Sequence, residues 1–294
     1  MNDYLVRGMS MDGFVKVVAI RSTELVRRGA QIQGTTPNAT AAFGRALTAA
    51  SMMGNMQKVE NGSMTLQIRG GGPIGTITVV SDPEGNVRGC VTEPKVPLAE
   101  KYPGKLDVGA TVGTDGTLTI IRDLQMKEPY IGSTPLVSGE IGDDVSSYFA
   151  TSEQTPTVCA LGVRVNPDLS VKSAGGFLLQ VLPGADDAVL DKIEANIAKI
   201  KSVSQMIADG MTAEEIIATV LEGIEYDLFD EFDTGYVCPC SREKYLVALA
   251  GLSQKDIDEL EAEGGPIETE CRFCDRKFSF DMSEILAKRN EKAE

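Results

Sequence analysis

The sequence of 294 residues contains no histidine. Without an imidazole, the chain cannot form a Ser-His-Asp triad, a catalytic Cys-His pair or a hydrolytic zinc site that needs histidine ligands. Basic residues are also few, because 28 Lys and Arg stand against 43 Asp and Glu, which gives a net charge of −15. Phosphate binding requires a basic surface, so nucleic acid is not an expected partner.

Long apolar runs are also missing. No stretch of the sequence has the apolar length that crosses a membrane, and the first residues, 1–7, lack the apolar segment of a secretion signal. We therefore expect a cytoplasmic protein with no membrane partner. Paired cysteines in a reducing cytoplasm act as metal ligands or redox groups rather than as structural disulfides.

Four of the six cysteines stand in two close pairs, Cys238-Pro-Cys240 and Cys271-Arg-Phe-Cys274, with 30 residues between Cys240 and Cys271. This spacing predicts one tetrahedral site with four thiolate ligands, and zinc, one ion per chain, is its default occupant. The neighbouring residues are not those of a ferredoxin-type cysteine run, so an iron–sulfur cluster is the weaker alternative. A zinc ion held by four thiolates has no open position for water. It is therefore structural or redox-active rather than a Lewis-acid catalyst.

The first 183 residues carry more strand patterns than helix patterns, which predicts an α+β fold with a mostly antiparallel sheet. Cys90 and Cys159 fall within strand patterns, and we interpret both as buried, inert core thiols. Thr36-Pro37 is a start signal for a long helix, and Glu140 begins a short one. We expect strands at residues 14–20, 64–68, 74–80, 87–91, 159–165 and 176–182, and a hairpin over residues 111–121 around Asp115-Gly116.

A glycine-rich segment lies between two of these strands. Gly70, Gly72 and Gly75 match the dinucleotide-binding fingerprint in spacing. That fingerprint has to open a helix, whereas here another strand pattern follows. We interpret the segment as a turn, and the chain then has no credible nucleotide-binding loop.

After Pro183-Gly184 the sequence becomes helical and charged. Two capping boxes, Ser202-x-x-Gln205 and Thr212-x-x-Glu215, mark helix starts, and the acidic and aromatic segment 225–233 resembles a linker. We therefore expect an α+β core domain at residues 1–183, a helical linker region at 184–230 and a small zinc-binding domain at 231–294. Domains as small as the last one often need a metal to fold.

The residues alone leave the role of the cysteine site open. A structural zinc that stays reduced and a thiolate switch that loses zinc on oxidation both fit the spacing. A nucleic-acid-binding zinc ribbon is a further alternative, supported only by Arg272, Arg276 and Lys277; the segment from Glu231 onward has nine Lys and Arg against fifteen Asp and Glu. A thiol oxidoreductase using Cys271-x-x-Cys274 would need that motif at the start of a helix in a βαβ unit.

Several motifs resemble those of the redox-regulated 33-kDa heat-shock chaperones of bacteria, the HslO family. The resemblance covers nearly the whole chain, and the four cysteines show no departure from the family pattern. The motifs are Phe43-Gly-Arg-Ala-Leu47, Gly72-Pro-Ile-Gly75, Ser152-Glu-Gln-Thr-Pro-Thr157, Ala174-Gly-Gly-Phe-Leu-Leu-Gln180, Leu182-Pro-Gly-Ala185, and Cys238-x-Cys240-Ser241 with Cys271-x-x-Cys274.

The resemblance implies a molecular chaperone, not an enzyme, which holds unfolding client proteins without ATP. It implies a reduced, zinc-bound, inactive form. Under oxidative stress with heat or unfolding, Cys238–Cys240 and Cys271–Cys274 disulfides form and zinc is lost. The linker and tail then unfold, and the protein forms a homodimer that binds its clients.

Overall fold

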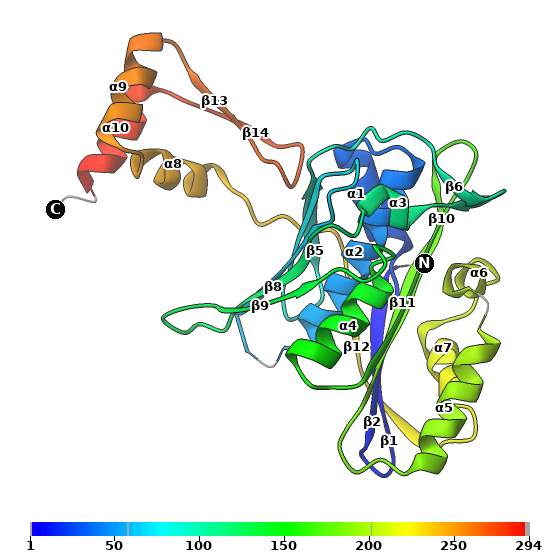
Figure 1. Ribbon diagram of the computed structural model, residues 1–294. Helices are drawn as coiled ribbons and strands as arrows, with labels where there is room; N and C mark the ends of the chain where they lie inside the picture. The colour runs from blue at the N-terminus through cyan, green and yellow to red at the C-terminus, as the bar shows by residue number, and fades with distance from the viewer. Residues whose placement is uncertain (1, 58, 201, 292–294) are drawn as a thin grey trace. The chain divides into compact units, whose positions relative to one another are not determined.

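The computed structural model describes residues 2–57, 59–200 and 202–291, and the chain divides into two compact units, Met1–Val237 and Cys238–Glu294 (Figure 1). Residues 231–237, which the sequence placed with the zinc-binding domain, lie in the first unit. Residues 292–294 of that expected domain are outside the described residues. No helix in the described ranges combines the length and apolar character that a membrane crossing requires.

Two five-stranded antiparallel sheets form the frame of the first unit, which confirms the predicted α+β class. The first sheet has the order β10-β11-β2-β1-β12, and the second has the order β5-β4-β3-β8-β9. The strands of the first sheet are β1 (Tyr4–Ser10), β2 (Val15–Arg21), β10 (Thr157–Val165), β11 (Val171–Val181) and β12 (Tyr226–Asp233). Those of the second are β3 (Ser63–Arg69), β4 (Thr76–Ser81), β5 (Val87–Val91), β8 (Thr117–Asp123) and β9 (Tyr130–Pro135). A small hairpin pairs β6 (Glu100–Tyr102) with β7 (Lys105–Leu106).

Helix α2 (Pro37–Asn55) is buried along almost its whole length and packs against strands of both sheets. Pro37 occupies its first turn, as the sequence predicted, because proline lacks the N–H that this position would leave unbonded. Small residues let neighbours approach closely. A Cβ on Gly44 would lie 2.6 Å from a methyl group of Val26, which belongs to α1 (Thr23–Gln33). Helix α4 (Gly142–Ser152) packs against β9 and β10.

A second hydrophobic core lies on the other face of the first sheet. Helices α5 (Asp187–Lys199), α6 (Val203–Ala208) and α7 (Ala213–Val220) supply its helical side, and β1, β2 and β11 supply its sheet side (Figure 1). Thr212 and Glu215 form the predicted reciprocal capping box, and Ser202 accepts from the N–H of Gln205. The helices expected to form a linker region are therefore a packed layer of the first unit.

Two predicted elements are wrong. Residues 111–121 do not form a hairpin, because α3 (Val108–Val112) ends there and only β8 follows. Asp107 caps α3 by accepting from the N–H of Ala110 at 2.8 Å, which outweighs the β-branched character of the helix.

The supposed linker segment 225–233 forms β12, which pairs with β1 at the edge of the first sheet. Its acidic side chains, Asp227, Asp230, Glu231 and Asp233, are all exposed to water.

The glycine-rich segment joins β3 to β4 as a turn, as predicted. Gly70 and Gly72 are required there by close backbone packing. A Cβ on Gly70 would lie 2.4 Å from the carbonyl oxygen of Gly113, and one on Gly72 would lie 2.5 Å from that of Thr111. The glycines therefore serve packing between the turn and the end of α3.

The second unit contains α8 (Arg242–Ala250), α9 (Gln254–Glu263), β13 (Ile267–Glu270), β14 (Lys277–Phe280) and α10 (Met282–Glu291). Strands β13 and β14 form an antiparallel hairpin. The fully buried core is small and consists of Ile257, Phe280 and Ile285, with partly buried side chains around it. So few buried apolar groups give little stabilisation, since each contributes about 1.5–3 kcal/mol.

Candidate metal centre

Two short loops carry the four paired cysteines. Cys238 and Cys240 lie just before α8, whose first turn is capped by Ser241, which accepts from the N–H of Lys244 at 3.3 Å. Cys271 and Cys274 lie in the turn between β13 and β14. This turn is closed by backbone bonds from Cys271 N–H to the carbonyl oxygen of Arg276 and from Cys274 N–H to that of Cys271.

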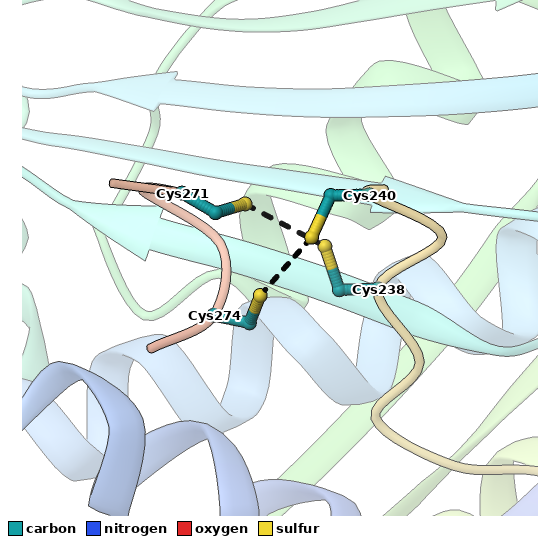
Figure 2. A group of neighbouring side chains, drawn as sticks. All are labelled: Cys238, Cys240, Cys271 and Cys274. Atoms are coloured by element: carbon teal, nitrogen blue, oxygen red, sulfur yellow. Dashed lines mark hydrogen bonds between the residues drawn. The ribbon is translucent and has the colours of Figure 1, made fainter. Parts of the chain in front are cut away.

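The four sulfur atoms point toward one another (Figure 2) and all lie within 4.8 Å of each other. The Sγ atoms of Cys238 and Cys271 are 3.7 Å apart, and those of Cys240 and Cys274 are 3.4 Å apart. Cys271 and Cys274 are only 5% and 6% exposed, whereas Cys238 and Cys240 are half-buried. Reagents in solvent therefore reach Cys238 and Cys240 more readily than Cys271 and Cys274.

The donor set fits a tetrahedral metal ion. Metal–sulfur bonds of about 2.3 Å in a tetrahedron require sulfur–sulfur separations of about 3.8 Å. The separations of 3.7 and 3.4 Å are close to that value before any ion is placed. Four soft sulfur ligands favour zinc over hard cations such as magnesium and calcium. The four cysteines can therefore hold a metal ion.

The surroundings of Cys271 favour the thiolate form of this residue. Burial opposes ionisation of Cys271, but hydrogen bonds from the Tyr245 hydroxyl and from the N–H groups of Phe273 and Cys274 outweigh it and lower the pKa of Cys271 to about 7. Burial raises the pKa of Cys238 and that of Cys240, and the adjacent sulfur atoms raise that of Cys240 further. A cation at the centre would stabilise all four thiolates, because it opposes their mutual repulsion.

The sequence did not identify three side chains that support the site. The Tyr245 hydroxyl bonds to the Cys271 sulfur, and its ring packs 5.1 Å from that of Phe278. Arg276 donates to the carbonyl oxygen of Cys240 at 3.0 Å, and Lys244 donates to that of Pro239 at 2.9 Å. Arg276, which the sequence singled out only as part of a small basic cluster, thus ties one cysteine loop to the other. A tyrosine four residues after the helix cap was the available signal for Tyr245.

The two remaining cysteines lie in the first unit. Cys159 is buried in β10, as predicted, and burial raises the pKa of its thiol to about 12. The prediction for Cys90 is wrong in part, because this residue is half-buried on the outer face of β5. Alternation along the strand turns Val87, Gly89 and Val91 inward and Cys90 outward.

The context of the second cysteine pair differs from that of a dithiol oxidoreductase. Cys271 and Cys274 occupy a turn between antiparallel strands, not the start of a helix after a parallel strand. Cys271 and Cys274 therefore lack the adjacent helix start that activates the nucleophile in thioredoxin-like proteins.

Comparisons with known proteins give one consistent relationship. The sequence profile of the family described as "Hsp33 protein" matches residues 3–281. A relative named 33 kDa chaperonin from Clostridium botulinum (strain 657 / Type Ba4) is 42% identical over 285 residues, covering 97% of this chain and 96% of the relative. A 33 kDa chaperonin from Clostridium tetani is also 42% identical, covering 97% of each chain.

A solved structure is similar over the full length. It is the crystal structure of the 33 kDa chaperonin, also named heat shock protein 33 homolog, from Thermotoga maritima. The TM-score is 0.89 at 31% sequence identity, and the alignment covers 100% of this chain and 99% of that one.

Proposed function

The chain belongs to the Hsp33 protein family, and from that premise we propose that it is a redox-regulated, ATP-independent holdase. In the reduced state, Cys238, Cys240, Cys271 and Cys274 hold one zinc ion and the protein is inactive. In the oxidised state, the same residues form two disulfides, and the protein binds unfolding clients as a homodimer. The observation that carries this proposal is the convergence of the four sulfur atoms within 4.8 Å.

When bound by Cys238, Cys240, Cys271 and Cys274, zinc would supply positive charge that keeps the four sulfurs ionised, and it would join the two cysteine loops. The chain itself supplies the rest of the reduced state. Tyr245 and Arg276 hold the loops in register, and the ion pair of Arg242 with Glu284 at 2.7 Å fixes α8 against α10. Because the core of this unit is small, thiolate ligation contributes a large part of its stability, on the order of 10 kcal/mol.

Oxidation removes the ligands. Two thiolates give up two electrons to a peroxide as their sulfur–sulfur bond forms, and the peroxide O–O bond breaks to give two hydroxide ions. Two equivalents of peroxide therefore convert four thiolates into two disulfides. A disulfide sulfur is a poor metal ligand, so the unit loses the interaction that joins its two loops. The unit then opens and exposes apolar side chains such as Tyr245, Ile257 and Phe280.

The proposal involves no catalytic turnover. The sequence has no histidine, and the glycine-rich turn at 70–75 packs against the end of α3 rather than opening a helix for phosphate. Clients are protected by occupancy of exposed apolar surface rather than by chemistry. The expected location is the cytoplasm, where reduced thiols and zinc coexist until oxidants accumulate.

One oxidant titration tests the proposal. Zinc release, thiol loss and suppression of light scattering by a thermally unfolding client are measured on the same samples, without nucleotide. We expect the three quantities to rise together and to reverse on addition of dithiothreitol and zinc. If the reduced, zinc-loaded chain suppresses aggregation as well as the oxidised chain, the cysteines are structural and the redox mechanism is wrong.

A further inference from the structure

A groove of about 660 Å³ follows strand β10 in the first unit. Its floor is the second half of the strand, residues 161–165. One wall is the turn between β6 and β7, and the other is the start of α6. This volume is within the range of about 300–1,000 Å³ that is typical of ligand sites. The proposed function does not use this groove.

Strand β10 is the edge of its sheet, so among the residues that the structure describes no strand pairs with the outer side of its backbone. The N–H of Cys159 donates to the Ser146 hydroxyl at 3.0 Å, which shows that Cys159 turns its backbone away from β11. Backbone groups of an antiparallel strand alternate in direction, so those of Leu161 and Val163 also point outward. Helix α4 covers the edge at Cys159, whereas the groove lies along it from residue 161 onward.

The packing on both faces of β10 locates the groove at the strand edge. A Cβ on Gly162 would lie 2.5 Å from the backbone nitrogen of Ser204, so α6 covers that face. The Val163 side chain lies against Gly44 of α2 on the opposite face. Residues of both helices line the groove, which therefore passes around the edge of β10 from one face to the other.

The charge of the groove is opposite to that of the chain. Arg45, Lys105 and Arg164 line it, and the described lining residues include no acidic side chain, although the whole chain has a net charge of −15. Arg45 is held by Glu140 at 2.5 Å, while its Nε is buried without a hydrogen-bond partner in the described structure. Lys105 and Arg164 stand at the groove exposed to solvent.

We propose that this groove binds an extended, acidic polypeptide segment, which adds to the sheet as a strand beside β10. The outward N–H and C=O groups of Leu161 and Val163 pair with the segment's backbone, as in β-strand addition. Arg164 and Lys105 select acidic side chains that alternate along it. This inference rests on the proposed function in one respect: it assigns the segment to an unfolding client, which presents extended backbone.

The test uses the full-length chain in its oxidised state, which is the client-binding state of the proposed function, and two fluorescein-labelled octapeptides, one alternating valine with glutamate and the other valine with lysine. Fluorescence anisotropy should show binding of the acidic peptide and at least about tenfold weaker binding of the basic one. Val163→Pro removes one outward N–H and should weaken acidic-peptide binding by about fivefold to tenfold. Val163→Ala loses similar packing but keeps the N–H, so it should bind within about twofold of the wild type.

A charge variant tests the groove independently, in case the Val163→Pro variant folds poorly. Lys105→Glu with Arg164→Glu should abolish the preference for the acidic peptide. Arg69→Glu with Lys172→Glu makes the same change in net charge outside the groove and should retain the preference. Peptide binding should also slow hydrogen exchange at the amides of Leu161 and Val163.

The results separate this inference from the proposed function. Equal binding of both peptides, or unchanged binding by Val163→Pro and the charge variant, overturns the groove assignment. Sedimentation that shows dimers dissociated by Val163→Pro assigns the groove to a second copy and also overturns it. A chain that binds the peptide through β10 but suppresses aggregation in neither redox state retains the groove and contradicts the holdase.

Discussion

The hydroxyl group of Tyr236 pairs with both backbone groups of Gly89: it donates to the carbonyl oxygen at 2.8 Å and accepts from the N–H at 3.1 Å. Backbone bonds join the same segments, since Val87 N–H donates to Gly235 and Val237 N–H donates to Val87. Residues 235–237 therefore cover the edge of β5. This anchor ends at Val237, the last residue of the first unit.

Removing the Tyr236 hydroxyl should loosen this anchor. Tyr236→Phe leaves the backbone groups of buried Gly89 without that partner, which costs about 1–3 kcal/mol. We expect a lower melting temperature of the first unit and faster hydrogen exchange at Gly89. Tyr102→Phe, at an exposed tyrosine of the β6 strand, is the control and should leave both unchanged. Unchanged exchange at Gly89 in Tyr236→Phe would show that the backbone bonds alone hold the edge.

The second prediction concerns metal content and the six cysteines. Serine at any of the four clustered positions removes one thiolate, so we expect the purified protein to lose most of its zinc and the second unit to unfold. Serine at Cys90 or Cys159 should leave about one zinc ion per chain. Metal analysis and circular dichroism provide the measurements. Zinc loss in Cys159→Ser would place that thiol in the switch.

A third prediction follows from Asp3, which is 5% exposed and accepts from the N–H of Leu25 at 2.6 Å. Burial raises the pKa of Asp3 from 3.8 to about 6, against the lowering effect of its backbone hydrogen bonds. The folded state therefore binds this proton more tightly than the unfolded state. The resulting stabilisation is fully present below pH ~3.8 and is lost as the pH rises through ~6, by an amount on the order of 2–3 kcal/mol.

Asp3→Asn keeps the acceptor for Leu25 and removes the titration. Relative to the wild type, we expect this variant to gain stability as the pH rises from ~4 to ~7, as measured by urea unfolding at each pH. Asp12→Asn is the matched control with the opposite sign, because a side-chain bond from Ser10 lowers the pKa of Asp12. A difference between Asp3→Asn and wild type that does not change with pH would contradict the assigned pKa.

Local patterns in the sequence predicted the clustering of the four paired cysteines and most strands, because those features depend on near neighbours. Four cysteines in two close pairs have few geometric alternatives, and strand alternation over 64–68 and 74–80 led directly to β3 and β4. The errors arise where contacts between residues far apart in the sequence determine the local structure. The hairpin predicted at 111–121 is replaced by α3, which packs against the turn at Gly70–Gly72.

The acidic segment at 226–233 shows the same limit. Its composition is that of an exposed linker, and five of its side chains in a row are indeed exposed. It forms β12 because β1, more than 200 residues earlier, has an open edge. Arg7 on β1 then pairs with Asp230 at 2.6 Å and lies 4.7 Å from the Phe232 ring. No local pattern could have identified that partner strand.

The fourth prediction is the pairing of the oxidised cysteines. In the folded site, sulfur–sulfur distances of 3.7 and 3.4 Å join opposite loops, Cys238 with Cys271 and Cys240 with Cys274. Tetrahedral ligation of an ion by the four thiolates would require separations near ~3.8 Å for every pair, so distance alone does not select a pairing. Heat and oxidant act together when the unit opens locally, which exposes the buried Cys271 and Cys274.

Once the unit opens, sequence separation determines the pairing. One residue separates Cys238 from Cys240 and two separate Cys271 from Cys274, whereas 30 lie between the pairs. Closing a long loop costs more entropy than closing a short one, and the cost grows with loop length. We therefore expect Cys238–Cys240 and Cys271–Cys274 disulfides, detected by mass spectrometry of proteolytic peptides without reduction. Disulfides within each loop leave the two loops unlinked, so limited proteolysis should digest residues 238–294 while the first unit resists. Peptides joined between Cys238 and Cys271, with a second unit that stays resistant, would show that oxidation locks the site instead of opening it.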